Sequence, residues 1–220
     1  RYIDGTSGAG NVTLGHGRRR IAQAMAHQAG ELAYCFSSAF TNRPAMELAE
    51  RVVEIAPAGL NHTYFVSGGS EGVETALKLA RQYHLLRGHP DKHIVIARWR
   101  GYHGGSMGAV SATGVPSLRD PFEPWLANFP HISPCYPYRC QAPGCQGTCD
   151  LSCARELEQA ILAEGPESVA AFIAEPVVMG GMAAVPATED YFQEIRRICD
   201  AYDVLFIADE VITGYGRTGR

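Results

Sequence analysis

Residues 67–72 read SGGSEG, a glycine-rich turn between a short apolar run and a helical pattern. Glycines let a backbone approach an anion closely, and the N–H groups at a helix start have no partner within the helix. A phosphate site is therefore one interpretation, and a plain turn with a serine cap is the commoner one. The turn is not a Walker loop, since no Gly-Lys-Ser/Thr follows, and it lacks the G-x-G-x-x-G pattern of dinucleotide-binding folds.

Continuous apolar runs on both sides of this turn predict buried strands, at Thr63–Val66, His93–Ala97, Ala170–Ala174 and Val204–Ala208. Continuous rather than alternating runs are typical of parallel strands that are covered on both faces. Helical patterns lie between them, at Arg43–Ala56, Glu71–Leu86 and Glu189–Tyr202. This alternation predicts an α/β fold with a mostly parallel sheet and helices on both faces.

Helix-capping residues and one interruption of the alternating pattern add detail to this prediction. Thr41 or Asn42 is the expected cap of the first helix, with Pro44 in its first turn, and Thr188 is the expected cap of the last. Residues 116–153 interrupt the alternation, because they are rich in proline, glycine and cysteine, and predict a long loop or insert.

Polar and aromatic residues follow three of the predicted strands. An aromatic turn, GYHGG at residues 101–105, comes soon after the second strand, Glu175 follows the third and Asp209 the fourth. Ligands of open α/β sheets bind at the carboxyl ends of the strands. Each feature alone has a plain reading as a turn or cap, but together they favour a binding site at one edge.

The order of these motifs resembles the class III aminotransferases, which depend on pyridoxal 5′-phosphate (PLP). The resemblance rests on residues 65–81 (FVSGGSEGVETALKLAR), 101–104 (GYHG), 174–177 (AEPV) and 207–219 (IADEVITGYGRTG). The opening segments 2–4 (YID) and 14–17 (LGHG) are also similar. Order and spacing agree along nearly the whole chain, with Gly72 where the family usually has alanine.

The resemblance implies roles for the residues of the two glycine-rich turns. Gly69 and Ser70, with Gly68 beside them, are expected to bind the PLP phosphate. Tyr102 is expected to stack on the pyridine ring, with His103 close by to shape the pocket.

It also implies roles for residues that follow two strands. Asp209 is expected to pair with the protonated pyridine nitrogen and keep the ring cationic, as an electron sink requires. Val211 is expected to pack on the opposite face of the ring. Glu175 is expected near the ring edge, where it can orient a cofactor oxygen or the substrate. Asp209 and Glu175 are thus the expected catalytic residues of this chain.

The implied fold is the large domain of fold-type I PLP enzymes, in incomplete form. Residues 1–45 are expected to belong to an N-terminal segment of a smaller domain, and residues 46–220 to part of the large one. The chain contains two lysines, Lys78 and Lys92. The family's cofactor-binding lysine lies downstream of the Asp209 motif, so we expect it beyond Arg220, and both ends of the chain look like breaks in a longer protein.

The implied reaction moves an amino group from an amine, often an ω-amine, or an amino acid to a 2-oxo acid such as pyruvate or 2-oxoglutarate. The complete protein is expected to be a homodimer. An aminomutase or a decarboxylating transaminase on the same scaffold stays an alternative, as does a non-catalytic fragment.

Composition narrows the possible partners. The net charge of −4 offers no basic excess for nucleic acid or an anionic membrane. No signal-peptide pattern or long apolar run is present, which predicts a cytoplasmic protein with reduced thiols.

Five of the seven cysteines crowd into one segment, at positions 135, 140, 145, 149 and 153. Thiolates are good zinc ligands, but the usual C-x2-C spacing is missing. We therefore favour free thiols and no metal, with a zinc site as the alternative.

Overall fold

The computed structural model describes residues 1–140 and 149–219, which form two compact units, Arg1–Phe65 and Val66–Arg220. Cys145 lies outside the described residues. The expected division at residue 45 concerns the complete protein and stays a prediction.

The first unit contains two helices, α1 (Arg19–Glu31) and α2 (Arg43–Ile55). The predicted cap of α2 is confirmed, because the Asn42 side chain accepts a hydrogen bond of 2.9 Å from the Ala45 N–H. Pro44 lies in the first turn, where its missing N–H costs no helical bond. Helix α1 was not predicted.

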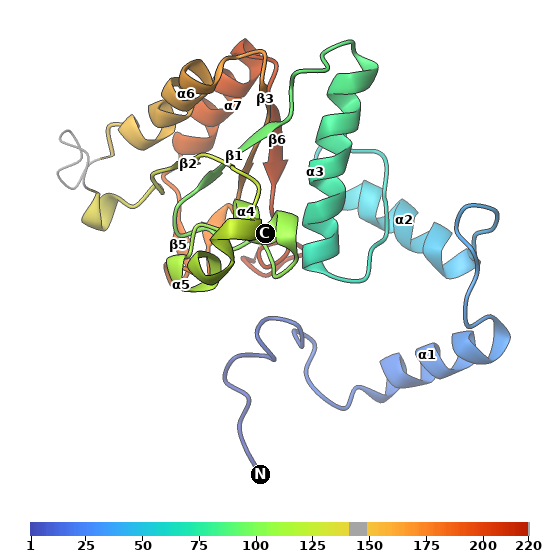
Figure 1. Ribbon diagram of the computed structural model, residues 1–220. Coiled ribbons are helices and arrows are strands. Elements are labelled where there is room, and N and C mark those ends of the chain that lie inside the picture. Colours follow the sequence, from blue (N-terminus) through green and yellow to red (C-terminus); the bar gives the residue numbers. More distant parts are fainter. Residues whose placement is uncertain (141–148, 220) are drawn as a thin grey trace. The chain divides into compact units, whose positions relative to one another are not determined.

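The second unit is built on a parallel sheet with the strand order β2-β1-β3-β6 (Figure 1). The strands are β1 (Ile94–Arg98), β2 (His131–Ile132), β3 (Val169–Ala174) and β6 (Leu205–Ala208), and β4 (Val177–Val178) pairs antiparallel with β5 (Val185–Pro186). The helices are α3 (Gly69–Leu86), α4 (Met107–Ala112), α5 (Pro116–Arg119), α6 (Ser152–Glu164) and α7 (Tyr191–Ala201), with 3-10 turns η1 (Asp120–Trp125) and η2 (Pro137–Arg139).

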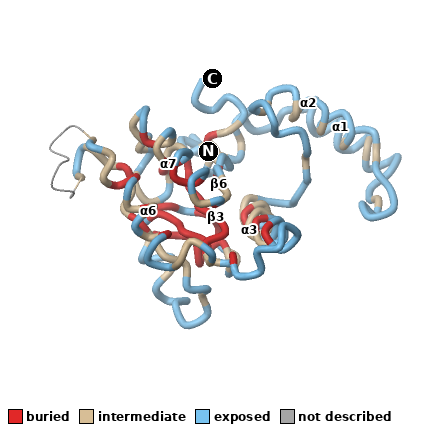
Figure 2. Tube along the Cα trace, turned by 90° about the horizontal axis from the view of Figure 1, so that it is seen from above, coloured by how far each residue is buried: buried red, intermediate tan, exposed pale blue. Residues whose placement is uncertain are grey.

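The two faces of the sheet carry separate cores, which explains the continuous apolar runs. Ile96 and Phe172 pack with residues of α6 and α7, whereas their strand neighbours Val95, Ala97 and Ile173 pack with residues of α3 and α4. Figure 1 shows these helix pairs on opposite sides of the sheet, and Figure 2 shows buried residues concentrated along its strands. The predicted α/β fold, with a mostly parallel sheet and helices on both faces, is confirmed.

Three local predictions are wrong. Residues 63–66 form no strand, because Tyr64, Phe65 and Val66 are exposed and no described strand pairs with them. The segment 116–153 is more than a loop, since it supplies the edge strand β2 and starts α6. Thr188 does not cap α7, whose first flanking residue is Asp190.

A buried lysine joins the amino-terminal ends of three strands. The Lys92 ammonium donates hydrogen bonds of 2.9–3.1 Å to the carbonyl oxygens of Pro166, Val169, Tyr202 and Asp203. Its side chain is almost completely buried. An ammonium has three N–H groups, so four carbonyls share them, and the buried charge ties together the segments that lead into β1, β3 and β6.

No helix among the described residues is both long and apolar enough to cross a membrane.

Candidate active site

A buried histidine–aspartate pair lies at the carboxyl edge of the sheet. Asp209 directly follows β6, and its N–H donates to the Ala174 carbonyl (2.9 Å), which holds it at the end of the ladder with β3. One Asp209 carboxylate oxygen lies 2.7 Å from His103 Nδ1, and the other accepts the Val211 N–H at 3.1 Å. Both side chains of the pair are buried. Each carboxylate oxygen keeps a lone pair for a further donor.

The aromatic turn is fixed by a threonine that the sequence analysis missed. The His103 N–H donates to Thr113 Oγ1 (3.0 Å), and that hydroxyl donates to the Ala109 carbonyl of α4 (2.9 Å). His103 Nε2 is buried and has no hydrogen-bond partner among the described residues. Nothing in the sequence marks Thr113, because its role depends on how α4 folds back onto the turn.

Glu175 holds the other side of this turn. Its two carboxylate oxygens accept the N–H groups of Tyr102 (2.9 Å) and Met179 (3.1 Å). Burial raises the pKa of Glu175, although both N–H donors favour the carboxylate. The Arg98 guanidinium donates to the Glu175 carbonyl. Glu175 thereby fixes the backbone of Tyr102, whose side chain stays exposed.

The start of α3 supplies a free helix end. Among the described residues, no side chain caps its first turn at Gly68, so the N–H groups that follow are available to an anion. Ser70 Oγ accepts the Gly105 N–H at 3.0 Å, which ties α3 to the aromatic turn. A Cβ at Gly69 would lie 2.9 Å from Val211 Cγ1, so glycine lets the helix start approach the Asp209 segment closely.

The structure thus brings together all the predicted site residues at one edge of the sheet. Contacts or hydrogen bonds join the α3 start to the Val211 segment, the aromatic turn to Ser70 and Glu175, and His103 to Asp209. Tyr102 and Val211, the two residues expected on opposite ring faces, are 42% and 61% exposed, so both are open to a ligand.

The two lysines lie elsewhere. Lys92 binds carbonyls at the amino-terminal ends of the strands, opposite the candidate site. Lys78 is exposed on α3, nine residues beyond Gly69 and thus about 13 Å along the helix.

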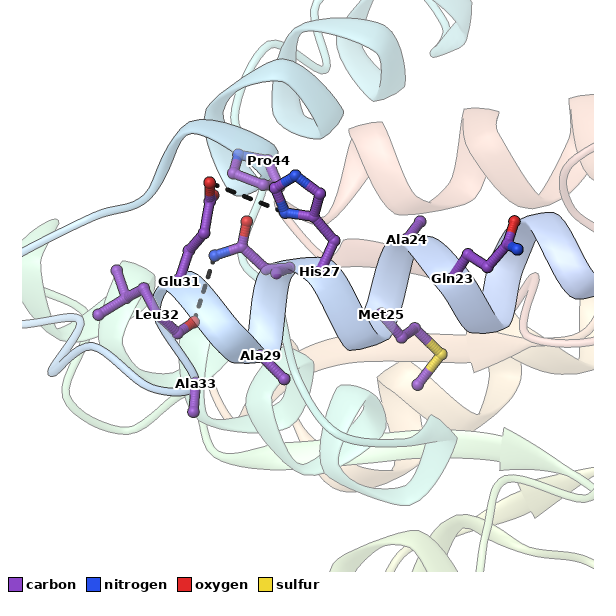
Figure 3. A pocket seen from close by; sticks show the side chains of 10 residues that line it. Gln23, Ala24, Met25, His27, Ala29, Glu31, Leu32, Ala33 and Pro44 are labelled. Carbon is purple, nitrogen blue, oxygen red and sulfur yellow. Dashed lines mark hydrogen bonds and ion pairs between the residues drawn. The ribbon is translucent and has the colours of Figure 1, made fainter.

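A hollow lies along α1 in the first unit. It has a volume of about 820 Å³ (Figure 3). The residues that line it are Gln23, Ala24, Met25, His27, Gln28, Ala29, Glu31, Leu32, Ala33 and Pro44. None of the predicted site residues is among them, and its polar side chains are partly engaged with the first unit itself, as in the Gln28 bond to the Leu32 carbonyl (3.2 Å).

Comparison with known proteins identifies the family. The model of the class III aminotransferases matches residues 1–220, and the chain belongs to this family. It is 40% identical to the diaminobutyrate–2-oxoglutarate transaminase of Halomonas elongata over 99% of this chain and 47% of that protein. It is 39% identical to the putrescine–pyruvate aminotransferase of Pseudomonas aeruginosa over 100% of this chain and 48% of that protein.

Solved structures agree with the sequence relatives. The ω-transaminase of Pseudomonas jessenii in complex with PMP superposes with a TM-score of 0.92 at 38% identity, over 100% of this chain and 49% of that one. A transaminase from ancestral reconstruction superposes with a TM-score of 0.92 at 42% identity, over 99% of this chain and 48% of that one. The chain therefore spans about half the length of the relatives that it matches.

Proposed function

We propose that the complete protein is a PLP-dependent aminotransferase and that residues 66–219 provide much of its cofactor site. One observation carries the proposal: the uncapped start of α3, the aromatic turn and the His103–Asp209 pair meet at one edge of the sheet. These are the three kinds of group that a phosphorylated, cationic, aromatic cofactor requires.

The residues present fit PLP. In the proposal, the N–H groups after Gly68, with Gly69 and the Ser70 hydroxyl, hold the phosphate, because the free end of α3 favours an anion. The exposed side chains of Tyr102 and Val211 cover the two faces of the ring. Bound there, PLP supplies the electron sink for breaking bonds at the amine carbon.

Asp209 is proposed to hold a proton at the pyridine nitrogen. Its carboxylate is buried and already oriented by His103 and by the Val211 N–H, so it needs little reorganisation to accept one more donor. The unpartnered His103 Nε2 faces a buried environment in which a further polar contact is favourable. Glu175 is proposed to contribute at the ring edge, chiefly by holding the Tyr102 backbone.

The names of the relatives support an amine donor and a 2-oxo acid acceptor. The relative from Halomonas elongata is named for diaminobutyrate and 2-oxoglutarate, that from Pseudomonas aeruginosa for putrescine and pyruvate, and that from Caulobacter vibrioides as an ω-aminotransferase. We propose the same classes of substrate here. Homodimeric assembly and a cytoplasmic location are likewise proposals for the complete protein, with no nucleic-acid or membrane partner.

The lysine that carries the cofactor is proposed to come from outside residues 1–220. Lys78 is exposed on α3, and the Lys92 ammonium is bound by four carbonyls at the opposite end of the strands. Lys92 would have to break these buried hydrogen bonds to leave its place, and Lys78 lies about 13 Å along α3 from Gly69. We therefore propose that residues 1–220 alone do not transfer amino groups.

The test uses the complete protein and a matched pair of cofactors. PLP and pyridoxal, which lacks the phosphate, are titrated and their affinities compared, and amino transfer from putrescine or diaminobutyrate to pyruvate or 2-oxoglutarate is then measured. Much tighter binding of PLP and transfer with at least one pair are expected. Equal affinities for PLP and pyridoxal would contradict the proposal that the start of α3 binds the phosphate. PLP binding without amino transfer to any acceptor would contradict the proposed reaction.

A further inference from the structure

Three cysteine sulfurs converge on the side of the sheet opposite α3. The Sγ atoms of Cys135, Cys149 and Cys153 all lie within 4.8 Å of one another. Cys135 follows β2, and Cys153 lies in the first turn of α6. Cys135 and Cys153 are buried, Cys149 is half-buried, and all three are free thiols. The sequence analysis favoured free thiols for the five crowded cysteines, because their spacing does not tell which sulfurs meet. The convergence of these three favours the zinc alternative instead.

Hydrogen-bond donors and a helix end lie beside two of the three sulfurs. The Thr188 N–H donates to Cys135 Sγ at 3.5 Å, and the Thr188 hydroxyl lies 3.7 Å from the same sulfur. Backbone N–H donors of this kind orient and stabilise thiolate ligands in metal sites. Cys153 lies in the first turn of the thirteen-residue helix α6, close to the positive end of the helix dipole.

We propose that Cys135, Cys149 and Cys153 bind one zinc ion through their sulfurs. A tetrahedral zinc thiolate site has Zn–S bonds of about 2.3 Å and therefore S···S separations of about 3.8 Å. Sulfurs already within 4.8 Å need to close by only about 1 Å to reach that geometry. Binding releases the three thiol protons to solvent and forms three Zn–S bonds, with no change of oxidation state. The site then carries one net negative charge if water is the fourth ligand, and two if Cys140 binds as a thiolate and releases a fourth proton.

A neighbouring cavity provides the fourth position and the charge compensation. It has a volume of about 600 Å³, and Cys140 and Cys153 both line it. Arg100, Arg139 and Glu156 also line this cavity, so positive charge exceeds negative charge in its lining. We assign the fourth position to the side that faces this cavity, with Cys140 or a water as the ligand.

The proposed role of the ion is structural. It would join the segment after β2, the start of α6 and the Thr188 segment that leads into α7, which are separate in sequence. With Cys140 as the fourth ligand the site would be closed, as in structural zinc sites, which contribute to folding rather than to chemistry. This role is independent of the proposed aminotransferase reaction, since none of these cysteines belongs to the candidate active site.

The experiment measures metal directly in the complete protein. The protein is expressed with zinc in the medium, purified without chelator and analysed for metal content, and the cleared protein is then titrated with Co²⁺. We expect about one zinc per chain and, with Co²⁺, the sulfur-to-metal charge-transfer and intense visible bands of a tetrahedral thiolate site. The half-buried Cys149→Ser is the principal variant, because it disturbs the core least, and it should lose zinc and weaken Co²⁺ binding at least tenfold.

The controls separate this site from the other thiols. Cys35→Ser and Cys199→Ser remove cysteines outside the trio and should retain the zinc. Cys140→Ser decides the fourth ligand: loss of charge-transfer intensity assigns Cys140, and unchanged intensity assigns water. Absence of both zinc and Co²⁺ binding would overturn the proposal, as would a disulfide among the three cysteines in non-reducing peptide mass analysis, or zinc that Cys149→Ser retains.

Discussion

His103 Nδ1 lies 2.7 Å from a carboxylate oxygen of Asp209, and the two side chains are 1% and 5% exposed. Residues 106 positions apart thus form a hydrogen bond away from water, where such a bond is strong. Its consequence is that Asp209 has a fixed orientation before any cofactor binds.

We expect Asp209→Asn in the complete protein to lower the rate of amino transfer about a thousandfold, which corresponds to about 4 kcal/mol of barrier. An amide keeps the shape of the side chain but does not stabilise a cationic pyridine nitrogen. Single-turnover rates with an amine donor measure the effect. Asp200→Asn, on the exposed face of α7, is the matched control and should be neutral. A change of less than tenfold for Asp209→Asn would remove this residue from the mechanism.

Gly104→Ala should displace the aromatic turn. The residue has φ = +134°, and an added Cβ would lie 2.5 Å from Ser70 Oγ. We expect a loss of about 1–3 kcal/mol in the free energy of unfolding and weaker binding of PLP. The neighbouring Gly105→Ala is the control, because nothing lies within 4 Å of its added Cβ. Urea unfolding and PLP titration of both variants test this, and equal effects of the two substitutions would contradict the steric argument.

Lys92→Met should destabilise the sheet by about 2–4 kcal/mol, because the buried carbonyls that Lys92 satisfies lose a charged donor. The midpoint of urea unfolding measures the loss. Lys78→Met replaces an exposed lysine and should change stability by less than about 0.5 kcal/mol. If both variants unfolded at the wild-type urea midpoint, the hydrogen bonds of Lys92 would make no net contribution to the free energy of unfolding.

Stability should fall in mild acid through His84. Its Nε2 lies 2.9 Å from the Ala170 carbonyl oxygen. A carbonyl can only accept a hydrogen bond, so Nε2 carries the proton and donates it. Burial lowers the pKa of His84. A base with a lowered pKa in the folded state binds fewer protons there than in the unfolded chain. The contribution of His84 to the free energy of unfolding is therefore complete above the unfolded pKa of about 6.5, and it decreases as the pH falls through that value.

The measurement is the free energy of unfolding between about pH 5 and pH 8 for the wild type and for His84→Gln. The variant should lose part of the acid dependence, and His27→Gln, on the exposed face of α1, should keep it. Parallel curves for the wild type and His84→Gln would contradict this assignment.

Residues 1–220 alone should form no stable covalent adduct with PLP. The expectation follows from the positions of Lys78 and Lys92, neither of which lies at the candidate site. The chain is mixed with PLP, desalted and examined by absorbance and then by borohydride reduction and peptide mass analysis. A chromophore that survives desalting and maps to either lysine would show that the amine reaches the ring.

The central strands of the sheet could be predicted from the sequence more reliably than its edge strand. Strands β1, β3 and β6 were recognised because both of their faces are buried, which makes the apolar runs continuous. Strand β2 was missed, because two residues carry no periodicity and His131–Ile132 becomes a strand only beside Ala97 and Arg98. The apolar run at residues 63–66 was misleading for the converse reason, since a strand also needs a neighbour.

The same distinction holds for the candidate site. Turn residues such as Gly69 and Asp209 could be predicted, because glycine-rich and acidic residues at strand ends have local signatures. Thr113 and the hydrogen bonds of Glu175 could not, because their partners are chosen by tertiary packing. Lys92 directly precedes the predicted strand His93–Ala97, but the four carbonyls around its ammonium come from distant segments, which the sequence does not show.

The position of Lys92 has a genetic consequence. It acts at the end of the strands opposite the proposed chemistry, so a substitution there would reduce how many molecules reach the native state without altering those that do. A gene with such a substitution would act as if less of the protein were made, and higher expression or a lower growth temperature would offset the loss. A substitution at Asp209 would leave the amount of folded protein unchanged and lower the activity of each molecule, so neither change in growth conditions would restore full activity.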